Sequence, residues 1–140
     1  MINGVAFLQM IPFWDIAFGN ETECALFGKA MGWEETDLKE IVVKIGAMEK
    51  ANTDRKRIVV ITQGADPTII FDGEKVTEYP VNKVETVVDT NGAGDAFVGG
   101  FLAQLTIGKD IAECVKGGNY AASTIIQHDG CTYPAKPAFE

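Results

Sequence analysis

The chain has 140 residues, enough for one domain, and 46% of them are hydrophobic while 23% are charged. This composition is that of a globular protein and excludes an intrinsically disordered chain. The formal net charge of −8 argues against nucleic acid or an anionic membrane surface as a partner.

The amino-terminal third predicts a strand followed by a capped helix. Residues 1–10 show no pattern that we can place. Residues 13–18 predict a short buried strand, because aromatic and β-branched residues surround a single aspartate. A helix should begin after Asn20, because Asn20 and Glu23 have the spacing of a capping box, and it should end at Gly32. The apolar face of this helix carries Cys24, Phe27 and Met31.

The middle of the chain predicts one more helix and three strands. The helix starts near Asp37, and apolar residues recur at helical spacing at Leu38, Ile41, Val42, Ile45 and Met48. Residues 51–57 are polar and basic and predict a linker. The continuous apolar run 58–61 predicts a strand buried on both faces, which ends at Thr62, Gln63 and Gly64. Two shorter strands follow, at residues 68–71 and 76–79, with a hairpin turn between them at Asp72-Gly73.

The last third predicts a strand and two helices. Residues 84–88 read as a strand, and a glycine-containing turn leads from them into an apolar, buried helix over residues 96–105. Another helix begins near Asp110, and its buried stripe consists of Ile111, Val115, Gly118, Ala122 and Ile125. This order of elements predicts an α/β protein with a layered sheet.

Cysteine usage and the start of the chain bear on the compartment. The three cysteines, Cys24, Cys114 and Cys131, form no Cys-x-x-Cys pair, and the chain has one histidine. We therefore expect no zinc site and a reducing compartment. Residues 1–14 are apolar but lack the basic segment of a signal peptide, and no apolar run approaches the roughly 20 residues of a membrane span. We expect a cytoplasmic protein, with the nucleus as the alternative.

Residues 89–101, between the last predicted strand and its helix, concentrate the chemistry. Gly92 and Gly94 lack a Cβ, so a ligand can approach the backbone N–H groups closely. The first N–H groups of a helix have no acceptor within it and lie at the positive end of its dipole, which suits a phosphate. Asp95 adds a carboxylate that suits a base accepting a proton from an attacking hydroxyl. The alternative is an ordinary helix start. Neither a dinucleotide fingerprint nor a P-loop is present.

The whole stretch, DTNGAGDAFVGGF at residues 89–101, closely resembles the carboxy-terminal signature of the ribokinase-like (PfkB-type) carbohydrate and nucleoside kinases. Together with FGNETE at residues 18–23 and GCTYP at residues 130–134, it is similar to the members that act on adenosine. The resemblance covers residues 11–140 and less than half of a family member. It implies a Rossmann-like layered sheet of the ribokinase-like fold. Residues 1–140 would form the nucleotide- and phosphate-binding carboxy-terminal portion, with the amino-terminal half and the lid absent.

The resemblance implies a reaction, transfer of the γ-phosphate of ATP to the 5′-hydroxyl of adenosine, which yields AMP in purine salvage. Asp95 would accept the hydroxyl proton. The backbone N–H groups of Gly92, Ala93, Gly94 and Asp95 would stabilise the charge that develops on the transferred phosphoryl group. The small-molecule partners would be adenosine and ATP, and the sequence predicts no oligomeric state.

The resemblance also implies nucleotide and metal contacts. ATP would contact Asn20, Thr62, Gln63, Gly64, Asn91 and Asn119. The strand-end residues among them fit the rule that ligands bind at the carboxyl ends of strands in open α/β sheets. Glu23 would hold Mg²⁺ through water, although a capping box alone would also explain Asn20 and Glu23. Potassium, a monovalent cation, would lie at Asp89 and the carbonyls of Ile125, His128 and Gly130.

Two other functions stay open beside an adenosine-directed kinase. One is a related sugar kinase of the same family, against which Asn91 and residues 130–132 argue. The other is a truncated, non-catalytic nucleotide-binding module, against which the retention of Asp95, Glu23 and both turn glycines argues. His128 is expected to be a surface or loop residue and not a base.

Overall fold

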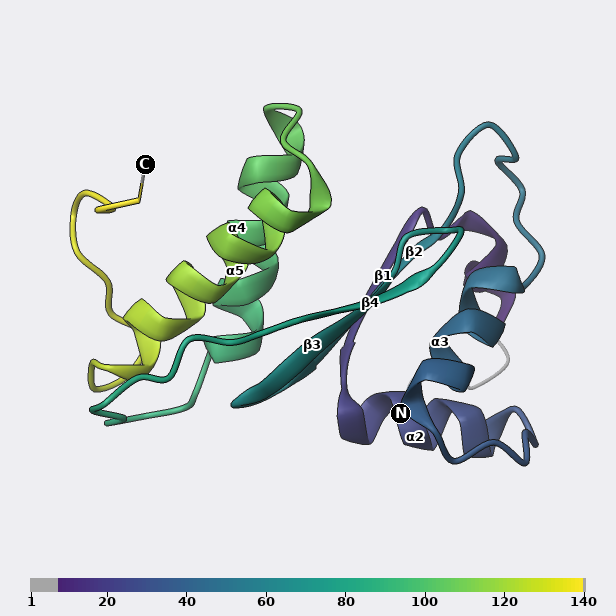
Figure 1. Cartoon of the computed structure of the whole chain (residues 1–140), viewed down its shortest axis with the longest axis horizontal. Coiled ribbons are helices and arrows are strands. Elements are labelled where there is room, and N and C mark those ends of the chain that lie inside the picture. Colours follow the sequence, from purple (N-terminus) through teal and green to yellow (C-terminus); the bar gives the residue numbers. More distant parts are fainter. Residues whose placement is uncertain (1–7, 140) are drawn as a thin grey trace. The chain divides into compact units, whose positions relative to one another are not determined.

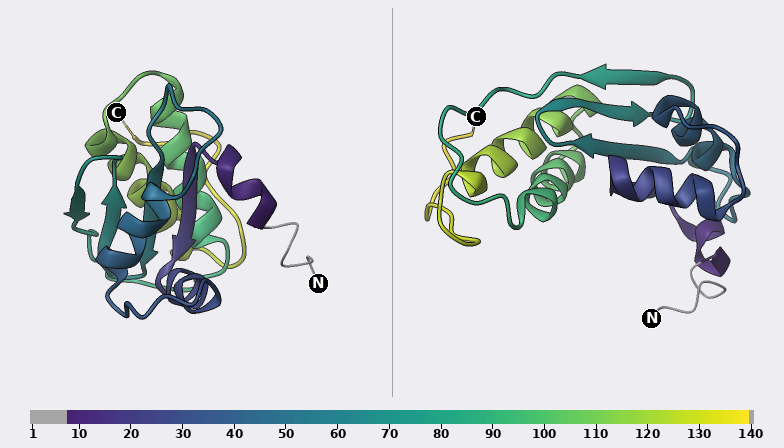
Figure 2. Two further views of the ribbon diagram at one scale, coloured as in Figure 1. Left: turned by 90° about the vertical axis from the view of Figure 1, so that its right-hand side faces the viewer. Right: turned by 90° about the horizontal axis from the view of Figure 1, so that it is seen from below.

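The computed structural model describes residues 8–139, and the chain divides into two compact units, Met1–Pro80 and Val81–Glu140 (Figures 1 and 2). We call them the amino-terminal and the carboxy-terminal unit. Most of the segment that the sequence left unplaced, residues 1–7, lies outside the described residues. Within residues 8–139, no helix combines the length and apolar character needed to cross a membrane.

The amino-terminal unit is a mixed four-stranded sheet with helices. The strands are arranged in the order β1-β2-β3-β4, with β1 parallel to β2 and the other pairs antiparallel. Their bounds are β1 Ile16–Asn20, β2 Ile58–Gln63, β3 Asp66–Phe71 and β4 Val76–Tyr79. The helices are the 3₁₀ helix η1 Ile11–Phe13, α2 Glu21–Ala30 and α3 Leu38–Ala47. This arrangement confirms the predicted α/β class and the hairpin between β3 and β4.

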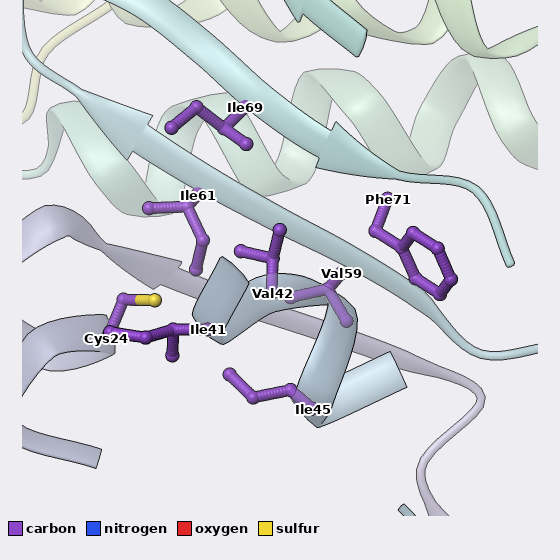
Figure 3. Close-up of a cluster of buried hydrophobic side chains, with 8 residues drawn as sticks. All are labelled: Cys24, Ile41, Val42, Ile45, Val59, Ile61, Ile69 and Phe71. Carbon is purple, nitrogen blue, oxygen red and sulfur yellow. The ribbon is translucent and has the colours of Figure 1, made fainter. Parts of the chain in front are cut away.

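The core of this unit lies between the sheet and helices α2 and α3 (Figure 3). It consists of Cys24, Ile41, Val42, Ile45, Val59, Ile61, Ile69 and Phe71. The packing is close at Gly46, where a Cβ would lie 2.2 Å from the Phe71 ring. The apolar spacing that predicted α3 thus corresponds to its buried face. The helix begins after Asp37 as expected, and Asp37 caps it by accepting a hydrogen bond from Lys39 N.

One prediction for this unit is wrong in part. The strand predicted at residues 13–18 begins only at Ile16, because Phe13 belongs to η1 and is 74% exposed. The predicted linker 51–57 is confirmed, since no helix or strand is assigned there, and its last residue, Arg57, is buried at 1% exposure. Its guanidinium donates hydrogen bonds to carbonyls of the η1 segment and the end of α3, namely those of Ile11, Trp14, Ile45, Met48 and Glu49. Arg57 therefore donates hydrogen bonds to carbonyl groups at helix ends that have no donor within their own helix.

The carboxy-terminal unit is built on α4 Ala93–Thr106 and α5 Ile111–Ile126 (Figure 1). The two helices lie close together where glycines face each other. A Cβ on Gly100 would lie 2.2 Å from the carbonyl oxygen of Gly117, and a Cβ on Gly118 would lie 2.7 Å from the Phe97 ring. The predicted stripe on α5 is confirmed at Val115, Gly118 and Ile125, which are buried, and Asp110 caps the helix.

The strand predicted at residues 84–88 is wrong. No strand is assigned there, and Val87 and Val88 are 54% and 56% exposed. The N–H groups of Val88 and Asp89 both donate to the carbonyl of Ile126 and not to a neighbouring strand. β-branched residues favour a strand mainly where their side chains pack on a sheet. The local sequence pattern therefore could not decide whether residues 84–88 form a strand. The prediction of a buried α4 is also only partly correct, since its buried residues are Phe97 and Phe101.

Candidate functional site

The start of α4 has the form that the glycine turn predicted. Gly92 precedes the helix with φ of +78°, a left-handed conformation that favours glycine. Ala93, Gly94 and Asp95 follow as the first helical residues, whose N–H groups have no acceptor within the helix. The N–H of Ala93 donates to the Thr90 carbonyl at 3.3 Å, so one of the predicted anion-binding groups has a local acceptor.

Asp89 holds the loop before α4 against the loop after α5. Its Oδ1 accepts from Asn91 N at 2.9 Å and its Oδ2 accepts from Gly130 N at 3.2 Å. These hydrogen bonds, that from Asn91 foremost, lower the pKa of the Asp89 carboxyl below its usual value. The carbonyls of Ile125 and Gly130 accept from His128 N and Thr132 N. Asp89 thus has a structural role that the sequence did not predict, and the potassium site stays a prediction.

A pocket of about 640 Å³ opens beside Asp95 within the carboxy-terminal unit. Its lining at and within the two helices consists of Gly92 before α4, Asp95 and Ala96 on α4, and Tyr120, Ala121, Thr124 and Ile125 on α5. The rest of the lining comes from the chain after α5, at Cys131, Tyr133, Pro134, Ala135 and Pro137. Asp95 is exposed and can meet a ligand there. Asn119, half-buried on α5, is not among these lining residues.

A second group of predicted residues meets at the carboxyl ends of β1 and β2 in the amino-terminal unit. Asn20 and Glu23 form the reciprocal capping box, with Asn20 N donating to Glu23 Oε2 at 2.9 Å and Glu23 N donating to Asn20 Oδ1 at 2.8 Å. Thr62 pairs with Asn20 across the two parallel strands, and its hydroxyl lies 3.4 Å from the Gly19 carbonyl. The predicted cap is confirmed, and a ligand-binding role for these residues stays a prediction.

Gln63 and Gly64 lie where β2 turns into β3. Gly64 has φ of +60°, so the turn itself favours glycine there. Gln63 Nε2 donates to the Pro67 carbonyl at 2.5 Å, which ties this side chain to its own hairpin. The structure therefore places the candidate residues in two groups, one in each unit. Asn20, Glu23, Thr62, Gln63 and Gly64 form the first, and residues 89–95 form the second.

A magnesium ion would find only a sparse set of protein ligands. Within the part of the chain that the structure describes, no three or more His, Cys, Asp or Glu residues gather to hold a metal. Magnesium at a phosphate site commonly uses one or two carboxylates and otherwise waters and phosphate oxygens. The exposed Glu23 carboxylate, with Oε2 accepting from Asn20 N, fits a contact to metal-bound water through its other oxygen.

Sequence reasoning missed the pocket-lining residues Tyr120, Thr124, Cys131 and Tyr133. Cys131 and Tyr133 lie in the GCTYP stretch that carried part of the resemblance, which was the available signal. Tyr120 has no such signal, because its contacts are made with residues 18 and 19 positions further along the chain.

Residues 4–138 match the sequence model of a protein family, described as pfkB family carbohydrate kinase. Adenosine kinase 1 of Arabidopsis thaliana is 53% identical over 133 residues, which are 94% of this chain and 39% of the relative. The structure of Anopheles gambiae adenosine kinase in complex with P1,P4-di(adenosine-5) tetraphosphate is 46% identical, with a TM-score of 0.92 over 98% of this chain and 41% of that one. Schistosoma mansoni adenosine kinase with adenosine and AMP matches at 30% identity and a TM-score of 0.85, over 98% and 41% of the two chains.

Proposed function

This chain belongs to the pfkB family of carbohydrate kinases, and from that premise we propose that it carries the phosphate- and nucleotide-binding part of an adenosine kinase. The reaction would move the γ-phosphate of ATP to the 5′-hydroxyl of adenosine. The observation that carries the proposal is the place of Asp95, which lies in the first turn of α4, the helix that the left-handed Gly92 precedes, and lines the pocket. The names of the relatives at 46–53% identity support the choice of adenosine.

Asp95 is the group that would take the proton. An exposed carboxylate beside the pocket can accept a hydrogen bond from a hydroxyl and then its proton, as the hydroxyl oxygen attacks the phosphorus. The proton ends on Asp95, and ADP leaves with the electrons of the broken bond. Phosphoryl transfer depends mainly on positioning and charge stabilisation, so a single base on a fixed helix turn is a suitable protein contribution.

The N–H groups at the start of α4 would hold the transferred phosphoryl group. Those of Gly94 and Asp95 have no acceptor within the helix, and the helix dipole adds partial positive charge. The N–H of Ala93 would exchange its 3.3 Å hydrogen bond to Thr90 for a phosphoryl oxygen. The loss of one such donor typically lowers the catalytic rate by a factor of about 10²–10³.

The amino-terminal unit would contribute nucleotide and metal contacts. Asn20 and Thr62 offer polar groups at the carboxyl ends of the parallel strands, where ligands commonly bind. Glu23 would contact the water shell of Mg²⁺. When bound, that ion would neutralise charge on the ATP phosphates. Potassium at Asp89 is part of the same proposal, although both Asp89 oxygens already accept backbone hydrogen bonds.

The chain spans about two fifths of the length of the relatives that it matches. A non-catalytic module that binds a nucleotide without transferring phosphate is the second candidate function. A sugar kinase is the third candidate, because the family as a whole is described as carbohydrate kinases and a probable sugar kinase from Rhizobium etli matches at 28% identity with a TM-score of 0.75.

One experiment separates the three. ADP release from MgATP by the purified chain is measured with adenosine, with ribose and with no acceptor, and binding of P1,P4-di(adenosine-5) tetraphosphate is measured in parallel. An adenosine kinase gives binding and adenosine-dependent ADP release. Release with ribose but not adenosine would replace the proposal by the sugar kinase. Binding with no release under any acceptor would replace it by the non-catalytic module.

A further inference from the structure

The chain after α5, residues 130–139, is tied to the rest of the carboxy-terminal unit at both ends. At its start, Gly130 N donates to Asp89 Oδ2 at 3.2 Å, and Cys131 Sγ lies 3.8 Å from the Asn91 carbonyl oxygen. At its end, Ala138 N donates to the Tyr120 hydroxyl at 2.6 Å. The rings of Tyr120 and Phe139 pack with centroids 5.3 Å apart and planes tilted by 41°.

The residues between the two ties line the pocket that contains Asp95. They are Tyr133, Pro134, Ala135 and Pro137. No helix or strand is assigned to this segment. The two prolines have no N–H to donate, and Tyr133 is 76% exposed, so local contacts hold this segment weakly. The position of this wall therefore depends on the ties at its ends.

We propose that residues 130–139 act as a strap that forms one wall of the Asp95 pocket, and that Tyr120 is the positioning residue that fixes its far end. The inference rests on the proposed function for its ligand, an adenine nucleoside or nucleotide held beside Asp95. Tyr120 acts through the strap, because its hydroxyl is engaged with Ala138 N and its ring with Phe139. When the far tie is lost, the wall occupies its bound position for a smaller fraction of the time.

The size of the effect follows from one hydrogen bond and one ring contact. A hydrogen bond of ordinary net strength changes a local equilibrium about two- to tenfold. The apparent affinity of a ligand falls by the same factor as the fraction of chains in the binding-competent state. Tyr120→Phe removes the hydroxyl and keeps the ring, so we expect affinity to fall by about two- to fivefold. Tyr120→Leu removes both contacts, and we expect a fall of about tenfold.

The test compares strap and control variants of the full chain. Tyr120→Phe and Tyr120→Leu alter the tie from α5, and Phe139→Ala removes the ring contact without changing the helix. Tyr79→Phe makes the same chemical change on β4 and serves as the control. Three quantities are measured: amide exchange of residues 132–139 and of α5 by NMR, the alkylation rate of Cys131, and the dissociation constants for P1,P4-di(adenosine-5) tetraphosphate and for adenosine.

The strap account predicts a selective pattern. Exchange rises at Ala138 and along residues 132–137 in the Tyr120 and Phe139 variants, while the α5 amides keep their protection. Alkylation of Cys131 stays within about twofold, because the tie at Asp89 and Asn91 is intact. Ligand affinity falls in the order expected, and Tyr79→Phe changes none of these quantities. A fall in affinity for the tetraphosphate alone would mean that the wall contacts the phosphate-bearing ligand. A fall in affinity for both ligands would mean that it contacts the nucleoside.

Two results would overturn the strap. The first is a faster Ala138 exchange with unchanged exchange at residues 132–137, since the far tie would then not hold the wall. The second is a loss of α5 protection in the Tyr120 variants together with no effect of Phe139→Ala, since Tyr120 would then only stabilise its helix. If the unaltered chain binds neither ligand, the proposed function fails, and the strap is judged on the exchange pattern alone.

Discussion

A side chain at position 92 would collide with Cys131, because a Cβ built on Gly92 would lie 2.6 Å from Cys131 Sγ. The loop before α4 and the loop after α5 thus meet at Gly92, where there is no room for a side chain. Gly92 also has φ of +78°. Its replacement should therefore affect both the stability of the carboxy-terminal unit and the shape of the candidate phosphate site.

We expect Gly92→Ala to destabilise the protein by about 2 kcal/mol or more, from the left-handed conformation and the contact with Cys131. Urea unfolding measures the change. Gly99→Ala is the matched control, since a Cβ there meets nothing within 4 Å and helical alanine is favoured by about 0.5–1 kcal/mol. Adding Cys131→Ala to Gly92→Ala should regain the part of the stability that was lost to the clash with Cys131 Sγ. The part lost to backbone strain at position 92 should remain lost. Equal stability of the two glycine variants would contradict the geometry.

Arg57 should be among the most costly positions of the amino-terminal unit. Arg57→Met leaves the carbonyls of Ile11, Ile45 and their neighbours without their donor, and we expect a loss of about 3 kcal/mol or more. Arg55→Met, the same change at an exposed position two residues earlier, should stay within about 0.5 kcal/mol. Tryptophan fluorescence during urea unfolding follows both. Similar losses at the two positions would mean that the buried guanidinium does not hold η1 to the end of α3.

The sequence predicted well what depends on neighbouring residues. The capping box of Asn20 and Glu23 could be predicted because the two residues lie three positions apart. The role of Arg57 was missed because a single arginine at the end of a polar run gives no periodic signal. Its acceptors also lie up to 46 positions away in the sequence. The strand expected at residues 84–88 failed because a strand needs a partner that local sequence does not specify.

The candidate site shows the same division. The turn at Gly92 and the first-turn position of Asp95 follow from local chemistry and were predicted. The wall formed by residues 131–137 depends on contacts of Asp89 and Tyr120 with positions far along the chain, and no spacing rule reveals these.

Acid should weaken the link that Asp89 makes between its two loops. Because hydrogen bonds from Asn91 and Gly130 lower the folded-state pKa of Asp89 below its usual 3.8, the stabilisation is present above that value and is lost as pH falls through the folded pKa. Asp89→Asn should therefore be less stable than the unaltered chain at pH 6, with a smaller further loss between pH 4 and pH 2. Melting temperatures across this range measure the effect. Asp129→Asn, also in the carboxy-terminal unit, is the control, and an Asp89→Asn curve parallel to the unaltered one would refute the linkage.

The three cysteines should differ sharply in reactivity. Cys24 and Cys114 are buried, and burial raises the pKa of both thiols, that of Cys24 to about 11. The thiolate is the reactive form, so these two should react slowly at pH 8. Cys131 is exposed, and one thiol per folded chain should react with a disulfide reagent, rising to three in urea. Cys131→Ser should abolish the fast phase, and fast reaction of two or more folded thiols would contradict the packing around α2 and α5.

In the proposed function, Asp95 is the base of a phosphoryl transfer to adenosine. Adenosine-dependent ADP release from MgATP by the purified chain, compared with Asp95→Asn, tests it most directly. The account predicts that the variant loses at least about 10²-fold in turnover, while its affinity for MgATP stays within a fewfold, because a general base contributes to the transition state more than to binding. Turnover by Asp95→Asn close to that of the unaltered chain would contradict the account.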